Sequence, residues 1–217
     1  MKAVIFDLDN TLYDHSKYLL GAFRDVSKYL SHKHSLNQRH VYKVLVSIWK
    51  KNTSMYPRVF NDLLDQLSIK EDVINLVNIF NAHVCNIAPY KDVRLLIKKL
   101  KKQKFLLGLI TDGTVDRQKR KLSALKLQNS FDVIIFTKEI GHPKPSHKPF
   151  LQALYKLGVK PENTFYIGDN PIVDFEGSKK VGMHTIRLLK GEFRKLKKNK
   201  YIDYEVKEII DIMKVIM

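Results

Sequence analysis

The sequence contains a single cysteine, Cys85, among its 217 residues. One cysteine excludes an intrachain disulfide and any metal site built from several cysteines. We expect Cys85 to be a small buried side chain, the usual setting of a free cysteine. A chain of this length can bury enough apolar surface to hold a core without disulfides.

Long hydrophobic runs are also missing. The first apolar run, residues 3–6, stops at Asp7 and is too short for the core of a signal peptide. No later segment approaches the roughly 20 apolar residues of a membrane helix. We therefore expect a cytoplasmic protein that makes no membrane contact.

Acidic residues are scarce relative to basic ones: 22 Asp and Glu stand against 39 Lys and Arg, a net charge of +17. Such a balance fits either nucleic-acid binding or a solvated lysine surface that attracts small anions. The basic clusters at residues 98–104 and 194–200 lack the interleaved aromatics of a single-strand platform. In the first cluster, the lysines follow the outer face of an amphipathic helical pattern. A small anionic partner is therefore favoured over nucleic acid.

Glycine is absent between Gly21 and Gly108, although the chain has nine glycines. A stretch with so few turn residues suits helices, and its apolar residues recur at steps of three and four. We predict that residues 15–90 form a helical bundle inserted between two parts of a core, residues 1–14 and 91–217.

The rest of the chain alternates between two patterns. Amphipathic helical patterns follow or separate short runs rich in β-branched residues. These runs are residues 3–6, 106–110, 133–136, 164–167 and 185–188, and the helical patterns are residues 93–102, 117–127, 148–157 and 174–181. This alternation predicts an α/β fold, a Rossmann-like parallel sheet with helices on both faces.

Polar residues follow four of the predicted strands. In open α/β sheets, ligands bind beyond the carboxyl ends of the strands, so these side chains should converge on one edge. Each short pattern alone also fits a surface turn; their occurrence together favours a site. The residues are Asp7 and Asp9, Thr111 and Asp112, Lys144, and Asp169, Asn170 and Asp174.

Three of these carboxylates, Asp7, Asp9 and Asp169, would repel one another if they packed together without a cation. Oxygen ligands without His or Cys select a hard ion, and Mg²⁺ suits a site that also holds phosphate. One carboxylate could attack phosphorus, and a second could exchange protons with the leaving group and water. Thr111 with the amides after it, and Lys144, would counter the charge on the phosphoryl oxygens.

Four motifs resemble those of the haloacid dehalogenase-like superfamily of phosphohydrolases, over residues 2 to about 189. They are residues 7–12 (DLDNTL), residues 109–113 (LITDG), Lys144 with Pro145 and Phe150, and residues 168–174 (GDNPIVD). The third commonly reads Lys-Pro-Asp-Pro, whereas residues 144–147 here read KPSH. Lys144 itself is in place.

The resemblance assigns a role to each motif. It implies that Asp7 is the nucleophile, Asp9 the acid/base and Thr111 a phosphate ligand. It also implies a Mg²⁺ ion held by the Asp7 carboxylate, the Asp9 backbone carbonyl and Asp169. Asp174 would contact the ion through water or would hydrogen-bond to the residues that bind it, and Asn170 would have a similar supporting role. The helical insertion would be a type-one cap.

The function expected from this resemblance is removal of phosphate from a small phosphomonoester, such as a sugar phosphate, a triose phosphate or a nucleoside monophosphate. Asp9 argues against a dehalogenase, which lacks an acid/base at that position. A phosphomutase shares all four motifs and stays open, as does a protein that binds nucleic acid or processes its ends on the same fold. Tyr13, Asp14 and His15, where the chain leaves for the insertion, fit either substrate contact or a hinge. The sequence makes no prediction of oligomeric state.

Overall fold

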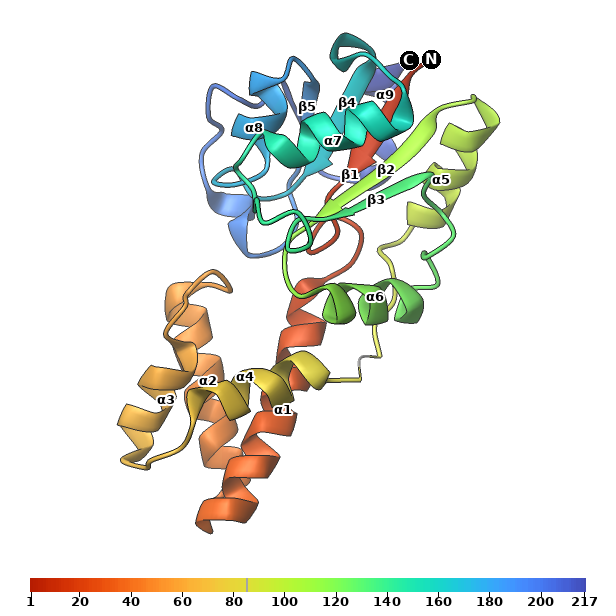
Figure 1. Cartoon of the computed structure of the whole chain (residues 1–217). Coiled ribbons are helices and arrows are strands. Elements are labelled where there is room, and N and C mark those ends of the chain that lie inside the picture. The colour runs from red at the N-terminus through yellow and green to blue at the C-terminus, as the bar shows by residue number, and fades with distance from the viewer. Residues whose placement is uncertain (85) are drawn as a thin grey trace. The chain divides into compact units, whose positions relative to one another are not determined.

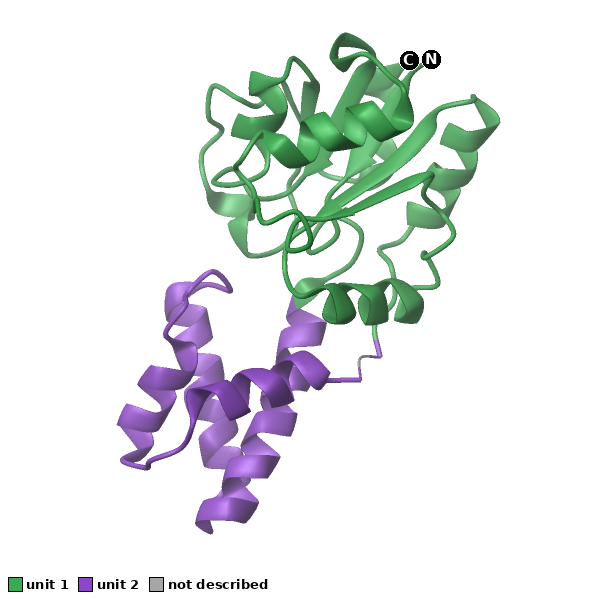
Figure 2. Ribbon diagram, in the orientation of Figure 1, with its two compact units in different colours: residues 1–15, 87–217 green, residues 16–86 purple. Residues whose placement is uncertain are grey.

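The computed structural model describes residues 1–84 and 86–217. Cys85 lies outside the described residues, so the expectation that it is buried stays a prediction. The described chain divides into two compact units, residues 1–15 with 87–217 and residues 16–86 (Figure 2).

The first unit is built on a six-stranded sheet in which every neighbouring pair is parallel. Its strand order is β3-β2-β1-β4-β5-β6. The strands are β1 (Ala3–Phe6), β2 (Leu106–Thr111), β3 (Val133–Phe136), β4 (Thr164–Gly168), β5 (His184–Leu188) and β6 (Tyr204–Val206). The order reverses direction at β1, so the loops after β1 and β4 flank a topological switch point, where such sheets bind ligands.

Helices cover both faces of this sheet (Figure 1). On one face lie α7 (Lys148–Leu157) and α8 (Phe175–Lys180), and on the other α5 (Val93–Lys102) and α9 (Ile212–Ile216). A further α-helix of the unit, α6 (Val115–Ala124), lies beside the carboxyl ends of β1 and β2. The fold class predicted from the sequence is confirmed.

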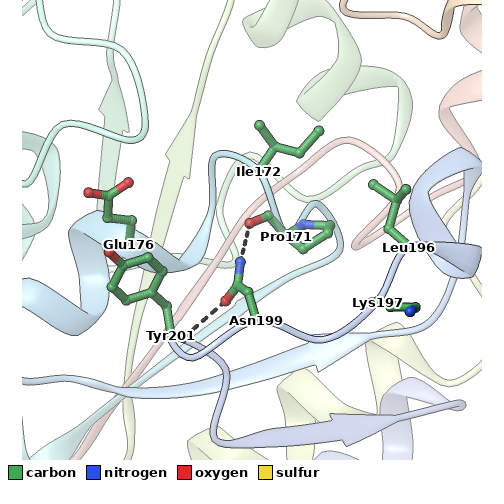
Figure 3. A pocket seen from close by; sticks show the side chains of 7 residues that line it. All are labelled: Pro171, Ile172, Glu176, Leu196, Lys197, Asn199 and Tyr201. Atoms are coloured by element: carbon green, nitrogen blue, oxygen red, sulfur yellow. Dashed lines mark hydrogen bonds between the residues drawn. The ribbon is translucent and has the colours of Figure 1, made fainter.

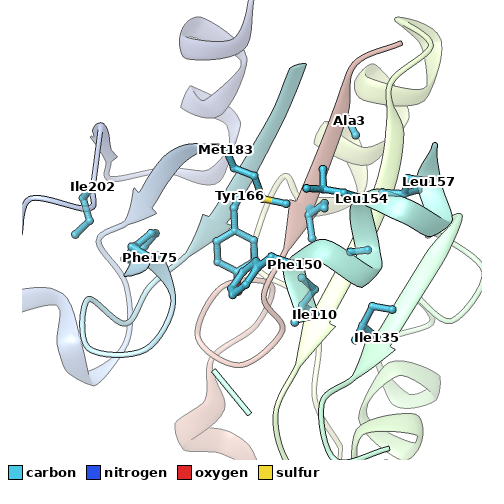
Figure 4. Close-up of a cluster of buried hydrophobic side chains, with 12 residues drawn as sticks. Ala3, Ile110, Ile135, Phe150, Leu154, Leu157, Tyr166, Phe175, Met183 and Ile202 are labelled. Atoms are coloured by element: carbon cyan, nitrogen blue, oxygen red, sulfur yellow. The ribbon is translucent and has the colours of Figure 1, made fainter. Parts of the chain in front are cut away.

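Apolar side chains from the sheet and from α7 and α8 form one continuous core (Figure 4). Phe150 of α7 meets Tyr166 of β4 edge to face, with ring centroids 4.9 Å apart. Ile110 and Phe175 belong to the same buried cluster. This packing fixes the ends of the strands from which the polar loops begin.

In the residues that the structure describes, the second unit consists of helices and the loops between them. It contains most of α1 (His15–His34), together with α2 (Gln38–Asn52), α3 (Val59–Leu67) and α4 (Val73–Ala82). Asn37 caps α2 by accepting from the amide of His40 at 3.0 Å, and Asp72 caps α4 in the same way. Leu30, Leu45 and Leu63 are fully buried in an apolar core of its own.

None of the helices formed by the described residues has the length and apolar character that crossing a membrane would require.

Candidate functional site

The centre of the site is a buried lysine between two carboxylates. Asp7 follows β1, Lys144 comes from the loop before α7, and Asp174 directly precedes α8. The Lys144 ammonium lies 2.6 Å from Asp7 Oδ1 and 2.7 Å from Asp174 Oδ1. All three side chains are buried. The structure thus brings together three residues that are far apart in the sequence.

Asp174 organises the loop that follows β4. Its Oδ2 accepts from the backbone amides of Asp169, at 3.2 Å, and Asn170, at 2.9 Å. The Tyr166 hydroxyl donates to its Oδ1 at 3.1 Å. A side chain at Gly168 would place its Cβ only 2.5 Å from Asp174 Oδ2, so this close approach requires glycine. Both carboxylate oxygens of Asp174 are therefore occupied by hydrogen bonds to neighbouring groups of the protein.

A cluster of carboxylate oxygens lies at the same place. Asp7, Asp169 and Asp174 each contribute an oxygen, and these lie within 4.8 Å of one another. Asp169 Oδ2 is buried and accepts no hydrogen bond from the described residues. A buried, unsatisfied carboxylate oxygen is costly, and a hard cation such as Mg²⁺ would satisfy it. The donor set thus fits a magnesium ion, with Asp7 and Asp169 better placed as ligands than the already engaged Asp174.

The electrostatics of the cluster point the same way. Burial raises the pKa of Asp7 to about 7, with Lys144 opposing the shift and Asp174 adding to it. Burial, followed by the charges of Asp174 and Asp7, raises the pKa of Asp169 well above its usual range. Burial alone would lower the pKa of Lys144, but Asp174 and Asp7 hold it well above its usual range. One ammonium is too little for three carboxylates, so a further positive charge would stabilise their ionised forms.

Asp9 occupies a different environment from Asp7. The Lys121 ammonium lies 2.8 and 2.9 Å from its two oxygens, and Gln118 donates to Oδ2 at 3.2 Å. Tyr13 and His15 also contact the Asp9 carboxylate. Burial would raise the pKa of Asp9, but His15 and Lys121 together hold it well below its usual range.

This position differs from the sequence expectation that the Asp9 carboxylate packs with those of Asp7 and Asp169. β1 ends at Phe6, and Asn10 has a φ of 60°, so the strict alternation of a strand stops before Asp9. Any contribution of Asp9 to a metal would come from its backbone carbonyl, as the resemblance implies.

Thr111 and Asp112, at the end of β2, have distinct surroundings. The buried hydroxyl of Thr111 accepts from Gln118 Nε2 at 2.5 Å. Asp112 Oδ1 accepts from the Thr137 hydroxyl at 2.5 Å and from the Lys144 amide at 3.3 Å. The Asp112 carboxylate thus braces the loop that carries Lys144.

Lys121 and Gln118 are the groups that sequence reasoning missed. Both lie in a strongly polar helix, VDRQKRKLSA, in which Lys121 is one of four basic residues. Nothing in the composition of that segment separates a buried lysine from its exposed neighbours. The one available signal is that Leu122, next to Lys121, and Gln118, three residues earlier, fall near one helical face.

A separate pocket lies beside the fourth motif (Figure 3). Asn199 lines it, donating to the Pro171 carbonyl at 2.7 Å and accepting from the Tyr201 amide at 3.0 Å. None of the clustered carboxylates lines it. Its lining residues are Pro171, Ile172, Glu176, Leu196, Lys197, Asn199 and Tyr201.

Comparison with known proteins agrees with this geometry. The model of the haloacid dehalogenase-like hydrolase family matches residues 4–188. The chain belongs to the haloacid dehalogenase-like hydrolase family. It is 32% identical to a glyceraldehyde 3-phosphate phosphatase of Methanocaldococcus jannaschii, over 99% of this chain and 97% of that protein. A protein of the same name from Methanopyrus kandleri is 30% identical, again over 99% of this chain and 97% of its own length.

A solved structure has the same fold. The HAD phosphatase of Thermococcus onnurineus superposes with a TM-score of 0.71, covering 99% of this chain and 97% of its own, at 23% identity. The family match and the phosphatase relatives together identify the chain as a phosphoric monoester hydrolase. The prediction of a phosphatase of this superfamily is confirmed.

Proposed function

We propose that this protein is a Mg²⁺-dependent phosphatase that hydrolyses a small phosphomonoester of the triose phosphate class through an aspartyl phosphate on Asp7. The observation that carries the proposal is the buried contact between Asp7 and Lys144, 2.6 Å apart, beside the unsatisfied oxygen of Asp169. It combines a carboxylate nucleophile with positive charge for a phosphoryl group.

In the first half-reaction, an Asp7 oxygen attacks phosphorus and the bond from phosphorus to the ester oxygen breaks. The negative charge of the bound phosphate ester raises the pKa of Asp9, which carries a proton at this stage and gives it to the departing alkoxide. The Lys144 ammonium, the Thr111 hydroxyl and the Asp112 amide counter the charge on the three transferring oxygens. The product is an alcohol and a phosphorylated Asp7.

In the second half-reaction, the Asp9 carboxylate takes a proton from water as that water attacks phosphorus. The bond from phosphorus to the Asp7 oxygen breaks, which releases inorganic phosphate and restores the Asp7 carboxylate. Asp9 is left protonated for the next substrate. The low pKa of Asp9 in the free protein favours the carboxylate that this step needs.

Asp7 and Asp169, with the Asp9 carbonyl, would hold Mg²⁺. The ion would supply positive charge to the phosphoryl oxygens and offset the repulsion among the carboxylates. Asp174 and Asn170 would keep the loop of Asp169 in place.

Two features support the choice of substrate. The relatives from Methanocaldococcus jannaschii and Methanopyrus kandleri carry the name glyceraldehyde 3-phosphate phosphatase and match over nearly their full length. The helical unit, residues 16–86, is inserted between β1 and the rest of the core, where a cap would restrict the substrate to a small molecule and exclude water. Such a metabolite fits the predicted cytoplasmic location.

The test is phosphate release from a panel of triose, sugar and nucleoside phosphates. We expect glyceraldehyde 3-phosphate to give the highest kcat/KM, with activity that EDTA abolishes and Mg²⁺ restores. Activity that survives exhaustive chelation would contradict the metal, and a preference for nucleoside monophosphates would contradict the substrate class. Formation of an isomeric phosphate ester instead of free phosphate would favour the phosphomutase alternative.

A further inference from the structure

Helix α6 carries a buried cation that the reaction described above does not use. Lys121 is fully buried, whereas Lys119 and Arg120 on the same helix are exposed. Removing an ammonium from water is costly, and an apolar side chain of similar volume would often stabilise the fold as well or better. Stability alone therefore does not explain a buried lysine at this position, and a role toward a neighbouring charged group would explain it.

That partner is Asp9. The Lys121 ammonium lies 2.8 Å from one Asp9 oxygen and 2.9 Å from the other, so it donates to both oxygens of the carboxylate. Tyr13 lies beside the same carboxylate, and the Lys121 ammonium is 6.0 Å from the Tyr13 ring centre. The contacts restrict the rotation of a side chain that has to exchange protons at a defined point.

Gln118, one turn earlier on α6, links Asp9 to the phosphate-binding strand end. Its Nε2 lies 3.2 Å from Asp9 Oδ2 and 2.5 Å from Thr111 Oγ1. Because the Thr111 oxygen accepts from Gln118, the hydroxyl hydrogen of Thr111 stays available to donate to a phosphoryl oxygen. One amide thus orients both groups.

We propose that Lys121 and Gln118 are positioning residues: Lys121 fixes the Asp9 carboxylate for proton transfer, and Gln118 fixes Asp9 and the Thr111 hydroxyl relative to each other. The inference rests on the proposed function, because it assumes that Asp9 is the acid/base and Thr111 a phosphate ligand. Neither residue touches the reacting atoms. A single rigid helix then sets the distance between the proton donor and the phosphoryl site.

The dependence of the rate on the leaving group separates this role from a merely structural one. p-Nitrophenolate leaves without a proton, whereas the alkoxide of glycerol 3-phosphate needs one. General acid catalysis contributes typically 10²–10⁴-fold to such a step. In Lys121→Met, we expect kcat/KM for glycerol 3-phosphate to fall at least about tenfold, and kcat/KM for p-nitrophenyl phosphate to fall by less than about threefold.

The matched control is Lys119→Met, which removes an exposed lysine two residues away and should leave both values near those of the wild type. Equal losses on the two esters in folded Lys121→Met, or no loss on either, would overturn the role of Lys121. Thermal unfolding followed by circular dichroism verifies that the compared proteins are folded.

Gln118→Leu provides a second and independent readout. Without the amide the Thr111 hydroxyl loses its fixed orientation, so we expect inorganic phosphate to inhibit at least about fivefold more weakly, the loss of roughly one hydrogen bond. Unchanged inhibition by phosphate would overturn the role of Gln118. This variant also tests the proposal if Lys121→Met does not fold. It too should lower kcat/KM more for glycerol 3-phosphate than for p-nitrophenyl phosphate.

Failure of the proposed function would give a different result from failure of the positioning role. If the wild type hydrolyses neither these esters nor glyceraldehyde 3-phosphate, or if Asp7→Asn stays active, Asp9 has no established role and the function itself is wrong. If the wild type is active and Asp7→Asn is not, a parallel response of both esters to Lys121→Met refutes the positioning role alone.

Discussion

The two units bury different kinds of side chain. The core unit encloses charged groups from several elements. In the described part of the helical unit, the sole polar residue that is buried as a whole is Ser27, which donates to the Phe23 carbonyl at 2.6 Å, although the Glu71 side chain is only 3% exposed. The buried charged residues of the core unit are Asp7, Lys121, Lys144, Asp169, Asp174 and Arg187.

This difference indicates what each unit is for. Buried charges are expensive, and their ion pairs repay the desolvation cost only when geometry and hydrogen bonds are good. A fold selected for stability alone would resemble the apolar interior of the helical unit. The core unit retains charges where chemistry requires them and supports them with partners such as Arg187, which donates to the Asp169 carbonyl at 3.2 Å.

The largest effect is expected from removing the nucleophile. Asp7→Asn should lower turnover by at least about 10³-fold, because an amide does not replace the attacking carboxylate. Lys144 keeps its contact with Asp174, so the fold should persist. Phosphate release and thermal unfolding measure the two properties. As a control, Asp116→Asn removes an exposed carboxylate from α6 and should leave turnover unchanged. More than about a tenth of the wild-type rate in Asp7→Asn would rule out the covalent route.

Removing the buried ammonium should affect both chemistry and stability. Lys144→Ala is expected to slow phosphoryl transfer by roughly 10²-fold. It should also lower the free energy of unfolding by about 3–5 kcal/mol, because Asp7 and Asp174 lose their shared partner. Kinetics and urea unfolding, each with EDTA and with Mg²⁺, test the two effects.

The control for Lys144→Ala is Lys148→Ala, which removes a lysine four residues further along the chain. Lys148 is exposed and its ammonium contacts His142 at 2.9 Å, so its loss should change little. Similar losses in both variants would mean that overall charge, not the contact with Asp7, carries the effect. Mg²⁺ should recover more stability in Lys144→Ala than in the wild type, since it replaces missing positive charge among the carboxylates.

In the helical unit, the expected response is in stability rather than in chemistry. Leu45 is fully buried, and Leu45→Ala should cost about 2–5 kcal/mol through the lost packing and the cavity left behind. Ile74 is 67% exposed, so Ile74→Ala should change stability by less than about 0.5 kcal/mol. Turnover of p-nitrophenyl phosphate, measured below the unfolding transition, should stay near the wild-type value in both. A collapse of turnover in folded Leu45→Ala would contradict the division of roles.

The sequence predicted elements well where one signal dominated. Residues 3–6 and 133–136 are continuous apolar runs, and β1 and β3 have the bounds that these runs indicate. The amphipathic period likewise gives α5 and α7 at residues 93–102 and 148–157. β6 is only three residues long, and two of the three are exposed, so it leaves no periodic signal. It is held by pairing with β5, a long-range contact that local sequence does not encode.

The site was predictable to the level of strand ends but not of side-chain direction. Parallel topology alone brings Asp7, Lys144 and Asp174 to one edge. The turn after β1 then directs the Asp9 carboxylate toward α6, and that depends on the backbone conformation of a few residues. The burial of Lys121 was not predicted for a related reason: it depends on Asp9, an acidic partner 112 positions away in the sequence.

The smallest effect concerns an ion pair of the helical unit in which the lysine is exposed and the Glu71 side chain is not. Glu71 Oε2 lies 2.9 Å from the Lys33 ammonium and 3.3 Å from His34 Nε2. The hydrogen bond from Lys33, with further ones from the Asp72 amide and His34, lowers the pKa of Glu71 from 4.5 to about 2 although burial opposes the shift. A carboxyl whose pKa is lower in the folded state stabilises that state above its unfolded pKa.

The stabilisation by Glu71 should therefore be complete above about pH 4.5 and disappear as the pH falls toward about 2. Glu71→Gln, which removes the charge at every pH, isolates this contribution from the other carboxylates. We expect the wild type to melt at a slightly higher temperature than Glu71→Gln at pH 6, and the gap to close as the pH is lowered through that window. Asp65→Asn removes an exposed carboxylate from α3 and should show no such trend. A gap that stays constant with pH would mean that Glu71 acts through packing or hydrogen bonding and not through its charge.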